Sequence, residues 1–327
     1  MMDSKISVGI VGGAGYTAGE LIRILINHPH AQIKFVYSTS NAGNPVSGVH
    51  TDLLGDTDLQ FSGALSDVDV LFLCLGHGLS AEFLQKNSIA ESTRIIDLGN
   101  DFRVNNTTCG SRNFVYGLPE IFREEIRVAK SIANPGCFAT AIQLALLPLA
   151  KAGLLQDDVH VNAITGSTGA GRSLSETGHF SYRNNNVTIY NPFTHNHLGE
   201  IRKTLKLAQE GKDVSLKFIP IRGNFTRGIF ATLYMTCKLS GEEADNLYRK
   251  YYEDHPFTHV SAHEISLKEV VNTNKCFLRV QKVADQLLVV SAIDNLLKGA
   301  SGQAVQNMNL MFNLSENCGL QLKPLAF

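Results

Sequence analysis

Apolar runs of strand length alternate with longer helical segments through the first third of the chain. The strand-like runs lie at residues 6–11 (ISVGIV), 32–37 (QIKFVY), 68–75 (VDVLFLCL), 94–98 (RIIDL) and 128–133. Their near-continuous apolar character is typical of parallel strands that helices cover on both faces. The segment 115–122 (VYGLPEIF) contains glycine and proline and indicates a connector. The pattern therefore predicts an α/β protein that begins with a doubly wound parallel sheet.

The pattern changes after residue 133. An apolar run at 137–150 is long enough for a helix, and strand-like runs follow at 159–164, 216–221, 228–239, 265–271, 275–283 and 286–294. Helical periodicity returns from about Lys298. We therefore expect a dinucleotide-binding domain at 1–133 and a second, α+β substrate and dimerisation domain at 134–292. The last segment, 293–327, is expected to return its helix to the first domain.

Composition narrows the classes of partner. The 327 residues are 44% hydrophobic, and the formal net charge of −1 leaves no basic footprint for nucleic acid. No apolar stretch reaches membrane-spanning length and no signal peptide is visible, so we expect a cytoplasmic protein whose partners are small molecules and other copies of itself. The six cysteines are scattered without metal-ligand spacing, which indicates a reducing compartment and no metal site.

The apolar run at 137–150, where we expect a helix, begins with a cysteine. Asn134, Pro135 and Gly136 form a cluster of helix breakers, and the run CFATAIQLALLPLA follows directly. At a helix amino end the backbone amides and the helix dipole favour the thiolate, which is the nucleophilic form. Cys137 is therefore a candidate nucleophile. The alternative is a small buried hydrophobic residue in the first helical turn.

A glycine turn joins the first strand to the first helix. Gly12, Gly13, Gly15 and Gly19 depart from the strict GxGxxG spacing, but the order strand, glycine turn, helix suits a Rossmann-like phosphate site. The next strand ends in Ser38, Thr39 and Ser40, where an NAD site usually has an acidic residue. Hydroxyl groups leave room for a 2′-phosphate, so we expect NADP. An ordinary polar loop is the alternative.

Further candidates lie in loops. His77 follows a strand, at the edge where ligands of parallel sheets gather, and Arg103 could hold an anion through its planar guanidinium. The loop 165–173 (TGSTGAGRS) could surround an anion with amides and hydroxyls, with Arg172 supplying charge. His195 and His197 precede Glu200 in a spacing that favours general acid or base chemistry over metal binding. For each of these, an ordinary surface loop remains the alternative.

Several motifs together resemble the N-acetyl-gamma-glutamyl-phosphate reductases of arginine biosynthesis, relatives of aspartate-semialdehyde dehydrogenase. They span nearly the whole chain in order: GGAGYTAGEL (12–21), VYGLPE (115–120), NPGCFAT (134–140), GSTGAGR (166–172), HNHLGE (195–200), TRGI (226–229) and DNLLKGASGQAVQNMN (294–309). The combination is specific even though each piece alone is not.

The resemblance implies residue roles. Cys137 would form an acyl-enzyme thioester from an acyl phosphate, His197 would be the general acid or base, and NADPH would deliver the hydride. Oxyanion stabilisation would come from helix amides near Cys137 and from the side chain of Asn134. Substrate-binding residues would be Arg103, Asn134, Ser167, Arg172, His195, Glu200 and Arg227. Cofactor-binding residues would be Gly12, Ala14, Gly15, Tyr16, Thr17, Ser38, Ser40, His77 and Asn295. A homo-oligomer, dimer or tetramer, is expected.

The chain also departs from the family pattern. Asn196 and Gly199 replace an arginine and a proline of HRHxPE, and Ile221 and Asn224 replace a histidine and a proline of PHLxPxxRGI. These positions would line the pocket for the N-acyl group, so a succinyl group stays open beside acetyl. The sequence is also compatible with a reductase of aspartyl phosphate or of a carrier-linked acyl phosphate, and with an NADP-binding regulator without catalysis.

Overall fold

The computed structural model describes residues 5–76, 78–105 and 107–325, so the candidate His77 lies outside the described residues. The chain divides into two compact units. Unit 1 comprises residues 1–135 and 300–321, and unit 2 comprises residues 136–299 and 322–327. Compared with the expected division at 133/134 and 292/293, residues 293–299 group with unit 2. The reason is local, because Asp294 and Asn295 bind backbone and side chains of that unit.

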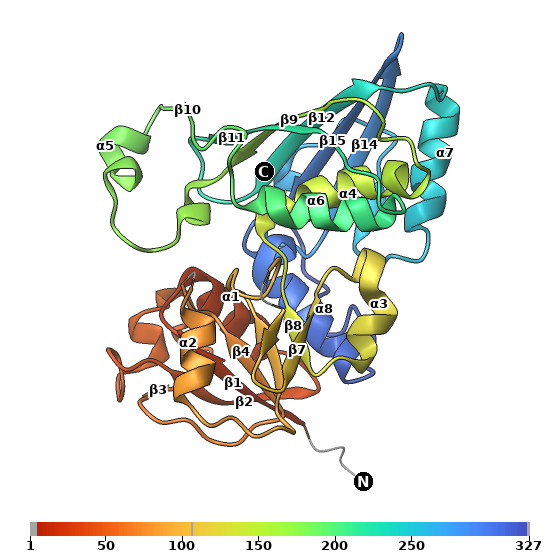
Figure 1. Ribbon diagram of the computed structural model, residues 1–327. Helices are drawn as coiled ribbons and strands as arrows, with labels where there is room; N and C mark the ends of the chain where they lie inside the picture. Colours follow the sequence, from red (N-terminus) through yellow and green to blue (C-terminus); the bar gives the residue numbers. More distant parts are fainter. Residues whose placement is uncertain (1–4, 77, 106, 326–327) are drawn as a thin grey trace. The chain divides into compact units, whose positions relative to one another are not determined.

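Unit 1 is built on an eight-stranded sheet in the order β3-β2-β1-β4-β5-β8-β7-β6 (Figure 1). Its strands are β1 (Ile6–Val11), β2 (Ala31–Tyr37), β3 (Phe61–Ser62), β4 (Val70–Leu73), β5 (Arg94–Asp97), β6 (Thr108–Cys109), β7 (Arg112–Tyr116) and β8 (Ser131–Ala133). Every pairing is parallel except that of β6 with β7. The predicted doubly wound parallel sheet is confirmed.

Helices cover both faces of this sheet. They are α1 (Tyr16–Leu25), α2 (Leu79–Lys86), α3 (Pro119–Val128) and α8 (Gly302–Met311), with short 3₁₀ turns at η1 (Val46–Gly48) and η2 (Thr51–Leu53). Val11, Leu73 and Ile95 form one apolar cluster with side chains of α2. Because successive strand residues face opposite sides, Ile10 and Phe72 point to the other face. Helix α8 contacts α1, α3 and β5.

Unit 2 has a seven-stranded mixed sheet in the order β10-β11-β9-β12-β15-β14-β13. Its strands are β9 (Val159–Thr165), β10 (Thr188–Ile189), β11 (Leu216–Arg222), β12 (Ile229–Thr236), β13 (Thr258–Val260), β14 (Cys276–Val283) and β15 (Gln286–Ile293). Helices α4 (Cys137–Lys151), α6 (His197–Ala208) and α7 (Gly241–Tyr252) lie together on one face (Figure 1). The short elements are α5 (Phe180–Arg183), η3 (Ser167–Ala170), η4 (Glu176–Gly178) and η5 (Leu267–Glu269).

Helix α4 forms the centre of unit 2. Every residue from Phe138 to Ala150 is buried, and α4 contacts α6, α7 and three strands. The Tyr248 hydroxyl of α7 donates to the Ala145 carbonyl at 2.6 Å. A helix that is apolar on all sides is stable only inside a core. The sequence prediction of a helix from Cys137 is confirmed.

Two predicted elements differ from the structure in kind. The segment 115–122 is not a connector, because it contains the end of β7 and the start of α3; its proline stands at a helix start, where the missing N–H costs nothing. Residues 265–271 are not a strand. They form the short turn η5, whose start is closed by a capping box between Ser266 and Glu269. The apolar side chains of Ile265 and Val270 pack on the sheet from this turn.

The last helix begins later than predicted. A π-helical turn, Leu297–Ser301, precedes α8 at Gly302. The Asp294 carboxylate accepts hydrogen bonds from the amides of Leu296 and Leu297, which holds this turn apart from the helix proper. Within the described part of the chain, no helix has both the length and the apolar character needed to cross a membrane.

Candidate active site

Cys137 is the first residue of α4. In the fully described stretch from Ser131 to Ala150, every residue is buried except Cys137, which is partly exposed. Gly136 precedes it as the N-cap with extended backbone and no side-chain cap. The amides of a first helical turn have no partner inside the helix, so the thiol lies at the positive end of a helix dipole. None of the six cysteines forms a disulfide, and all six lie in the described part of the chain.

Two glycines let other groups approach the cysteine closely. A Cβ atom on Gly299 would lie 2.8 Å from the Cβ of Cys137, and one on Gly136 would lie 2.4 Å from Nε2 of His197. Both distances are shorter than real Cβ contacts, so any side chain at either position would displace its neighbour. Sequence reasoning missed Gly299. A glycine inside the motif 294–309 can indicate a close backbone approach, but nothing in the sequence identifies Cys137 as the residue that approaches it.

Glu200 and His197 share the first turn of α6. Oε2 of Glu200 accepts a hydrogen bond from the Gly136 amide at 2.9 Å, and Oε1 lies 3.9 Å from Nε2 of His197. Both side chains are buried. The Glu200 carboxylate therefore lies at the amino ends of two helices, because it belongs to the first turn of α6 and binds the amide before α4. Both helix dipoles favour its negative charge. The two side chains form a pair that is able to hold a proton beside Gly136.

His195 lies in an aromatic surrounding. Its ring centroid is 5.4 Å from that of Phe138, 5.6 Å from that of Phe218 and 4.7 Å from that of His197. Burial lowers the pKa of His195 to about 4, although the charge of Glu200 opposes the shift. Its Nδ1 accepts a hydrogen bond from the His197 amide at 3.2 Å, which requires an unprotonated nitrogen. His195 is therefore neutral near pH 7 and orients the start of α6.

Tyr190 and Arg222 belong to the same surroundings, and sequence reasoning missed both. The Arg222 guanidinium carbon lies 4.8 Å from the centre of the Tyr190 ring, which is 5.7 Å from the His195 ring. Burial raises the pKa of Tyr190, and the negative charge of Cys137 raises it further while Arg222 opposes the shift. Tyr190 stands close before the histidines, so its place in that segment was a signal. Arg222 is the last residue of β11, and the sequence does not distinguish a ligand-binding arginine at this position from an ordinary surface arginine.

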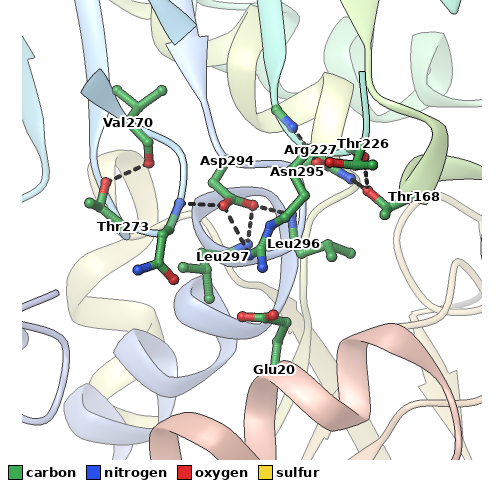
Figure 2. A network of polar contacts seen from close by, with 12 residues as sticks. Glu20, Thr168, Thr226, Arg227, Val270, Thr273, Asp294, Asn295, Leu296 and Leu297 are labelled. Atoms are coloured by element: carbon green, nitrogen blue, oxygen red, sulfur yellow. Dashed lines mark hydrogen bonds and ion pairs between the residues drawn. The ribbon is translucent and has the colours of Figure 1, made fainter. Parts of the chain in front are cut away.

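A polar network links four segments of unit 2, which contain Thr168, Arg227, Asn272 and Asp294 (Figure 2). Arg227 pairs with the fully buried Asp294 at 2.9 Å, and Asp294 also accepts from the Asn272 amide at 2.7 Å. Asn295 accepts from the Gly228 amide at 2.6 Å and donates to the Thr168 hydroxyl at 3.0 Å. The candidates Arg227 and Asn295 therefore both have partners within unit 2, and Asn295 binds the loop that carries Thr168.

The loop after β9 holds two other candidates. The Ser167 amide donates to the Phe225 carbonyl at 2.9 Å, and its side chain is partly exposed. Arg172 is exposed. A Cβ atom on Gly166 would lie 2.5 Å from the Thr226 carbonyl oxygen, so only glycine lets this loop pass the segment before β12.

In unit 1 the glycine turn leads into α1. Gly12 has a φ of +79°, and a Cβ atom there would lie 2.5 Å from the Cys74 carbonyl oxygen. Gly15 is the N-cap of α1, with no side-chain cap and no acidic residue in the first turn. Ala14 and Tyr16 flank it, and the Thr17 carbonyl accepts from Ser301 at 2.7 Å. The amino end of α1 therefore presents backbone in a cradle that Cβ atoms would fill.

Hydroxyl side chains follow β2. Asn41 donates to the hydroxyl oxygens of Ser38 and Ser40, at 3.1 Å each. The Ser38 amide donates to the Ser62 carbonyl at 3.0 Å, which fixes the turn. The segment from Ser38 to Asn41 contains no acidic residue, so it would not repel a phosphate group.

Asn134 and Arg103 lie in unit 1. The Asn134 amide group donates to the Ala300 carbonyl at 3.0 Å, and its oxygen accepts from Asn307 of α8 at 3.0 Å. Arg103 is buried and donates to the Leu98 carbonyl at 2.8 Å. Close by, burial raises the pKa of Asp97 to about 6 against hydrogen bonds from Ser80 and Gly99.

The structure thus brings Cys137, His195, His197 and Glu200 together in unit 2. The glycine turn, Ser38, Ser40, Arg103 and Asn134 lie in unit 1, and Asn295 lies in unit 2. Across residues 5–76, 78–105 and 107–325, no three His, Cys, Asp or Glu side chains converge as ligands for a metal ion. The arrangement in unit 2 can carry nucleophilic thiol chemistry assisted by a proton carrier.

Two family models match the chain. Residues 7–129 match the NAD binding domain of semialdehyde dehydrogenase, and residues 137–295 match the semialdehyde dehydrogenase dimerisation domain. Among solved structures, aspartate semialdehyde dehydrogenase II from Vibrio cholerae is similar with a TM-score of 0.73 at 15% identity, over 95% of this chain and 99% of that chain. Aspartate semialdehyde dehydrogenase with NADP from Candida albicans has a TM-score of 0.70 at 16% identity, over 96% and 100%.

Curated relatives are much more similar in sequence. Proteins named N-acetyl-gamma-glutamyl-phosphate reductase are 58% identical in Flavobacterium johnsoniae, 57% in Christiangramia forsetii and 55% in Parabacteroides distasonis. Each match covers 98% of this chain and 100% of the relative. The expected resemblance is confirmed over the whole length. The chain therefore belongs to the N-acetyl-gamma-glutamyl-phosphate reductases, oxidoreductases of the semialdehyde dehydrogenase family.

Proposed function

We propose that this protein reduces an N-acyl-gamma-glutamyl phosphate to the N-acyl-glutamate semialdehyde and phosphate, with NADPH, in arginine biosynthesis. The observation that carries the proposal is the position of Cys137 at the amino end of α4, with the His197–Glu200 pair against Gly136. The names of the relatives favour the acetyl compound as substrate.

The first step belongs to Cys137. The positive end of α4 favours its thiolate, which attacks the carbonyl carbon of the acyl phosphate. A carbon–sulfur bond forms, the bond from that carbon to the phosphate oxygen breaks, and phosphate leaves. Amides of the first turn of α4 would stabilise the oxyanion, because they lie at the helix end beside the sulfur. Asn134, the other candidate donor, already donates to Ala300 and is the weaker choice.

His197 is our proposed proton carrier. Once the thioester carbon has been reduced, its oxyanion re-forms the carbon–oxygen double bond of the aldehyde as the carbon–sulfur bond breaks, and His197 would give its proton to the leaving sulfur. Nε2 of His197 lies 3.9 Å from the carboxylate of Glu200, which can orient the ring, whereas Nδ1 of His195 already accepts a hydrogen bond from the His197 amide. Of the two histidines, His197 is therefore our choice for the acid.

The residues of unit 1 fit a dinucleotide with a 2′-phosphate. The Gly12–Gly15 turn has the room for a pyrophosphate at an uncapped helix start, with Ala14, Tyr16 and Thr17 around it. Ser38 and Ser40 offer hydroxyls and no negative charge where the ribose would lie. When bound, NADPH supplies the hydride that reduces the thioester. We also keep Asn295 as a candidate for the cofactor, and His77 by family resemblance.

The remaining candidates would hold the anionic groups of the substrate. Arg103 and Arg172 offer planar guanidinium groups, and Ser167 offers a hydroxyl and an amide in the same loop as Arg172. Arg227 would bind the substrate while paired with Asp294. Glu200 would act indirectly, through its contacts with His197 and the Gly136 amide. These roles rest on family resemblance together with the local contacts described above.

One observation favours a second candidate substrate with an N-succinyl group. Arg222 lies over Tyr190, near Cys137, and no carboxylate pairs with it in the described part of the chain. A partly buried cation stabilises a negative charge brought by a ligand. An N-succinyl group carries such a carboxylate and an N-acetyl group does not.

We further propose that the protein acts in the cytoplasm as a homo-oligomer, a dimer or a tetramer. Support for self-association comes from the match of residues 137–295 to a dimerisation domain.

The test is the reverse reaction. The purified protein is mixed with NADP and phosphate, and with N-acetyl-glutamate semialdehyde, N-succinyl-glutamate semialdehyde or aspartate semialdehyde. The formation of reduced nicotinamide is followed by its absorbance. We expect phosphate-dependent reduction of NADP with at least one of the two N-acyl aldehydes. Activity with aspartate semialdehyde alone, or none with any of the three, would contradict the proposal.

A further inference from the structure

The π-helical turn, Leu297–Ser301, lies between β15 and α8. Inside it, the Gly299 amide donates to the carbonyl of Asp294, five residues earlier, at 2.9 Å. Turns of this kind are rare, and they occur frequently at functional sites. The residues of the turn up to Gly299 belong to unit 2. An element this rare needs other contacts to hold it, and those contacts indicate what it does.

The Asp294 carboxylate holds the beginning of the turn. The side chain is fully buried, and Oδ1 accepts hydrogen bonds from the amides of Leu296 at 2.8 Å and Leu297 at 3.2 Å (Figure 2). Oδ2 accepts from the Asn272 amide and pairs with Arg227. A buried carboxylate is tolerated only where partners replace its water, and these groups do so. The backbone that enters the turn is therefore fixed.

Side chains of the turn are also held in the interior. Lys298 is 0% exposed, and its ammonium nitrogen lies 5.9 Å from the centre of the Phe257 ring, which attracts a cation over its face. Lysine is almost never fully buried unless it has partners. The neighbouring Leu297 side chain is fully buried as well. The turn therefore cannot move outward without exposing an apolar side chain and breaking the contacts of a buried cation.

Gly299 is required by space and not by backbone conformation. Its φ lies outside the left-handed region, so its conformation does not by itself call for glycine. A Cβ atom at this position would lie 2.8 Å from Cβ of Cys137, 3.2 Å from Cα of Cys137 and 3.3 Å from the Asp294 carbonyl oxygen. None of these atoms is the end of a flexible side chain that could turn aside. The missing side chain of Gly299 therefore leaves this space to Cys137.

The other side of this contact is equally rigid. Every residue of α4 from Phe138 to Ala150 is buried, so the helix cannot shift without disturbing the core of unit 2. Protein interiors are close-packed and leave little room for a compensating movement. Two fixed elements therefore meet at the Cα and Cβ atoms of Cys137, which carry the thiol.

We infer that Gly299 is a positioning residue, because the backbone of the π-helical turn sets where the Cys137 thiol lies at the amino end of α4. The inference rests on the proposed role of Cys137 as nucleophile. A contact of 2.8 Å is about 1 Å shorter than an ordinary carbon–carbon contact, so a side chain at position 299 would displace its neighbour by that amount. A displacement of about 1 Å is enough to lower a reaction rate by about 10²-fold.

The test compares Gly299→Ala with the unchanged protein. Alkylation of Cys137 by iodoacetamide is followed on its own peptide by mass spectrometry, without substrate and over a range of pH. The pH midpoint of alkylation should rise by about one unit, because a displaced thiolate loses the stabilisation of a helix end at a partly buried site. In the reverse assay, kcat should fall by about 10²-fold while the KM values for NADP and phosphate stay the same.

Gly9→Ala is the matched control for crowding alone. A Cβ atom at Gly9 would lie 2.4 Å from the Phe35 ring and 2.9 Å from the Leu71 side chain, so it crowds the core of unit 1. Gly9 also has a φ outside the left-handed region. This variant should lose stability in thermal unfolding and keep the alkylation midpoint of Cys137.

An unchanged alkylation midpoint in folded Gly299→Ala, an unchanged kcat where the unmodified protein turns over, or an equal shift of the midpoint in Gly9→Ala would overturn the inference. Where Gly299→Ala alone fails to fold, the double variant Cys137→Gly/Gly299→Ala should fold, because it lacks the Cβ atom that the new methyl group would crowd. A double variant that stays unfolded would also overturn the inference. Alkylation and folding require no turnover, so failure of this inference and failure of the proposed reaction are distinguishable.

Discussion

Two helix starts divide the chemistry of this protein. Helices α1 and α4 both follow a strand and a glycine N-cap, with no side-chain cap and no acidic residue in the first turn. At α1, Tyr16 is 40% exposed, and the glycines of the preceding turn present backbone groups instead of side chains. At α4, a cysteine begins the helix while a carboxylate, two histidines and two phenylalanines surround it. The same backbone device suits an anion from solvent in one case and a thiolate of the chain in the other.

The difference lies in what surrounds each helix dipole. An open, uncapped start suits a phosphate that arrives with its own charge. The start of α4 is enclosed, so its electrostatics act on fixed groups of the protein, and burial lowers the pKa of His195 to about 4. Changes at α4 should therefore affect chemistry, and changes near α1 should affect the choice of cofactor.

The largest effect is expected at Cys137. Cys137→Ser should reduce turnover at least about 10⁴-fold, because a serine hydroxyl lacks the acidity and nucleophilicity of a thiol. NADPH binding, followed by fluorescence titration, should stay unchanged. Cys318→Ser is the control, since Cys318 is also a partly exposed free thiol. Near-normal phosphate-dependent activity of Cys137→Ser would remove the distinction between the two helix starts.

His197→Asn should lower kcat by about 10²- to 10⁴-fold and leave measurable turnover, because general acid or base assistance contributes that much. His195→Asn should cost less, since His195 is neutral near pH 7 and acts through its hydrogen bond to the His197 amide. Steady-state kinetics of both variants give the comparison. A fully active His197→Asn beside an inactive His195→Asn would keep the mechanism and reverse the two roles.

Ser38→Asp should lower kcat/KM for NADPH by roughly 10- to 100-fold, because a carboxylate would repel the 2′-phosphate, and should improve use of NADH. Ser38→Ala, which removes the hydroxyl without adding charge, is the control. Ser38 is buried and its hydroxyl accepts from Asn41, so thermal unfolding of both variants is measured as well, to separate a loss of stability from a loss of cofactor binding. Equal use of both cofactors by the unmodified protein would contradict the role that we give to this turn.

The smallest predicted effect is on stability. His195 has a folded pKa near 4 against an ordinary value of 6.5, so below pH 6.5 the unfolded chain takes up a proton that the folded chain does not. This penalty grows as the pH falls from 6.5 toward 4. Between pH 7 and pH 5, urea unfolding should show a loss of about 2 kcal/mol more in the unmodified protein than in His195→Gln. An equal loss in both would mean that His195 is not held in a dry surrounding.

Local signals made part of the fold predictable. The helix that begins at Cys137 was readable because a breaker cluster meets a long apolar run, and the parallel sheet because its strands are continuously apolar. Pro119 led to the wrong prediction of a connector at 115–122, because proline usually breaks a helix but is well tolerated at its first position. The apolar residues around η5 alternate like a strand but serve one turn packed on the sheet.

Contacts between distant segments could not be predicted. Gly299 approaches Cys137 only because the π-helical turn after Asp294 brings it there, and Arg222 lies over Tyr190 only because β10 pairs with β11. Both depend on tertiary register, which no spacing in the sequence encodes. The histidine pair was predicted as a unit. The division of labour we propose for it followed from burial and hydrogen bonding, which only the structure supplies.

The proposed mechanism depends most on a covalent bond to Cys137. The protein is mixed with N-acetyl-gamma-glutamyl phosphate in the absence of NADPH, quenched in acid within milliseconds to seconds, digested and analysed by mass spectrometry. We predict that the peptide containing Cys137 gains the mass of the N-acetylglutamyl group, that hydroxylamine removes it, and that Cys137→Ser shows no such adduct. An adduct on another residue, or rapid turnover by Cys137→Ser without any adduct, would contradict the central claim.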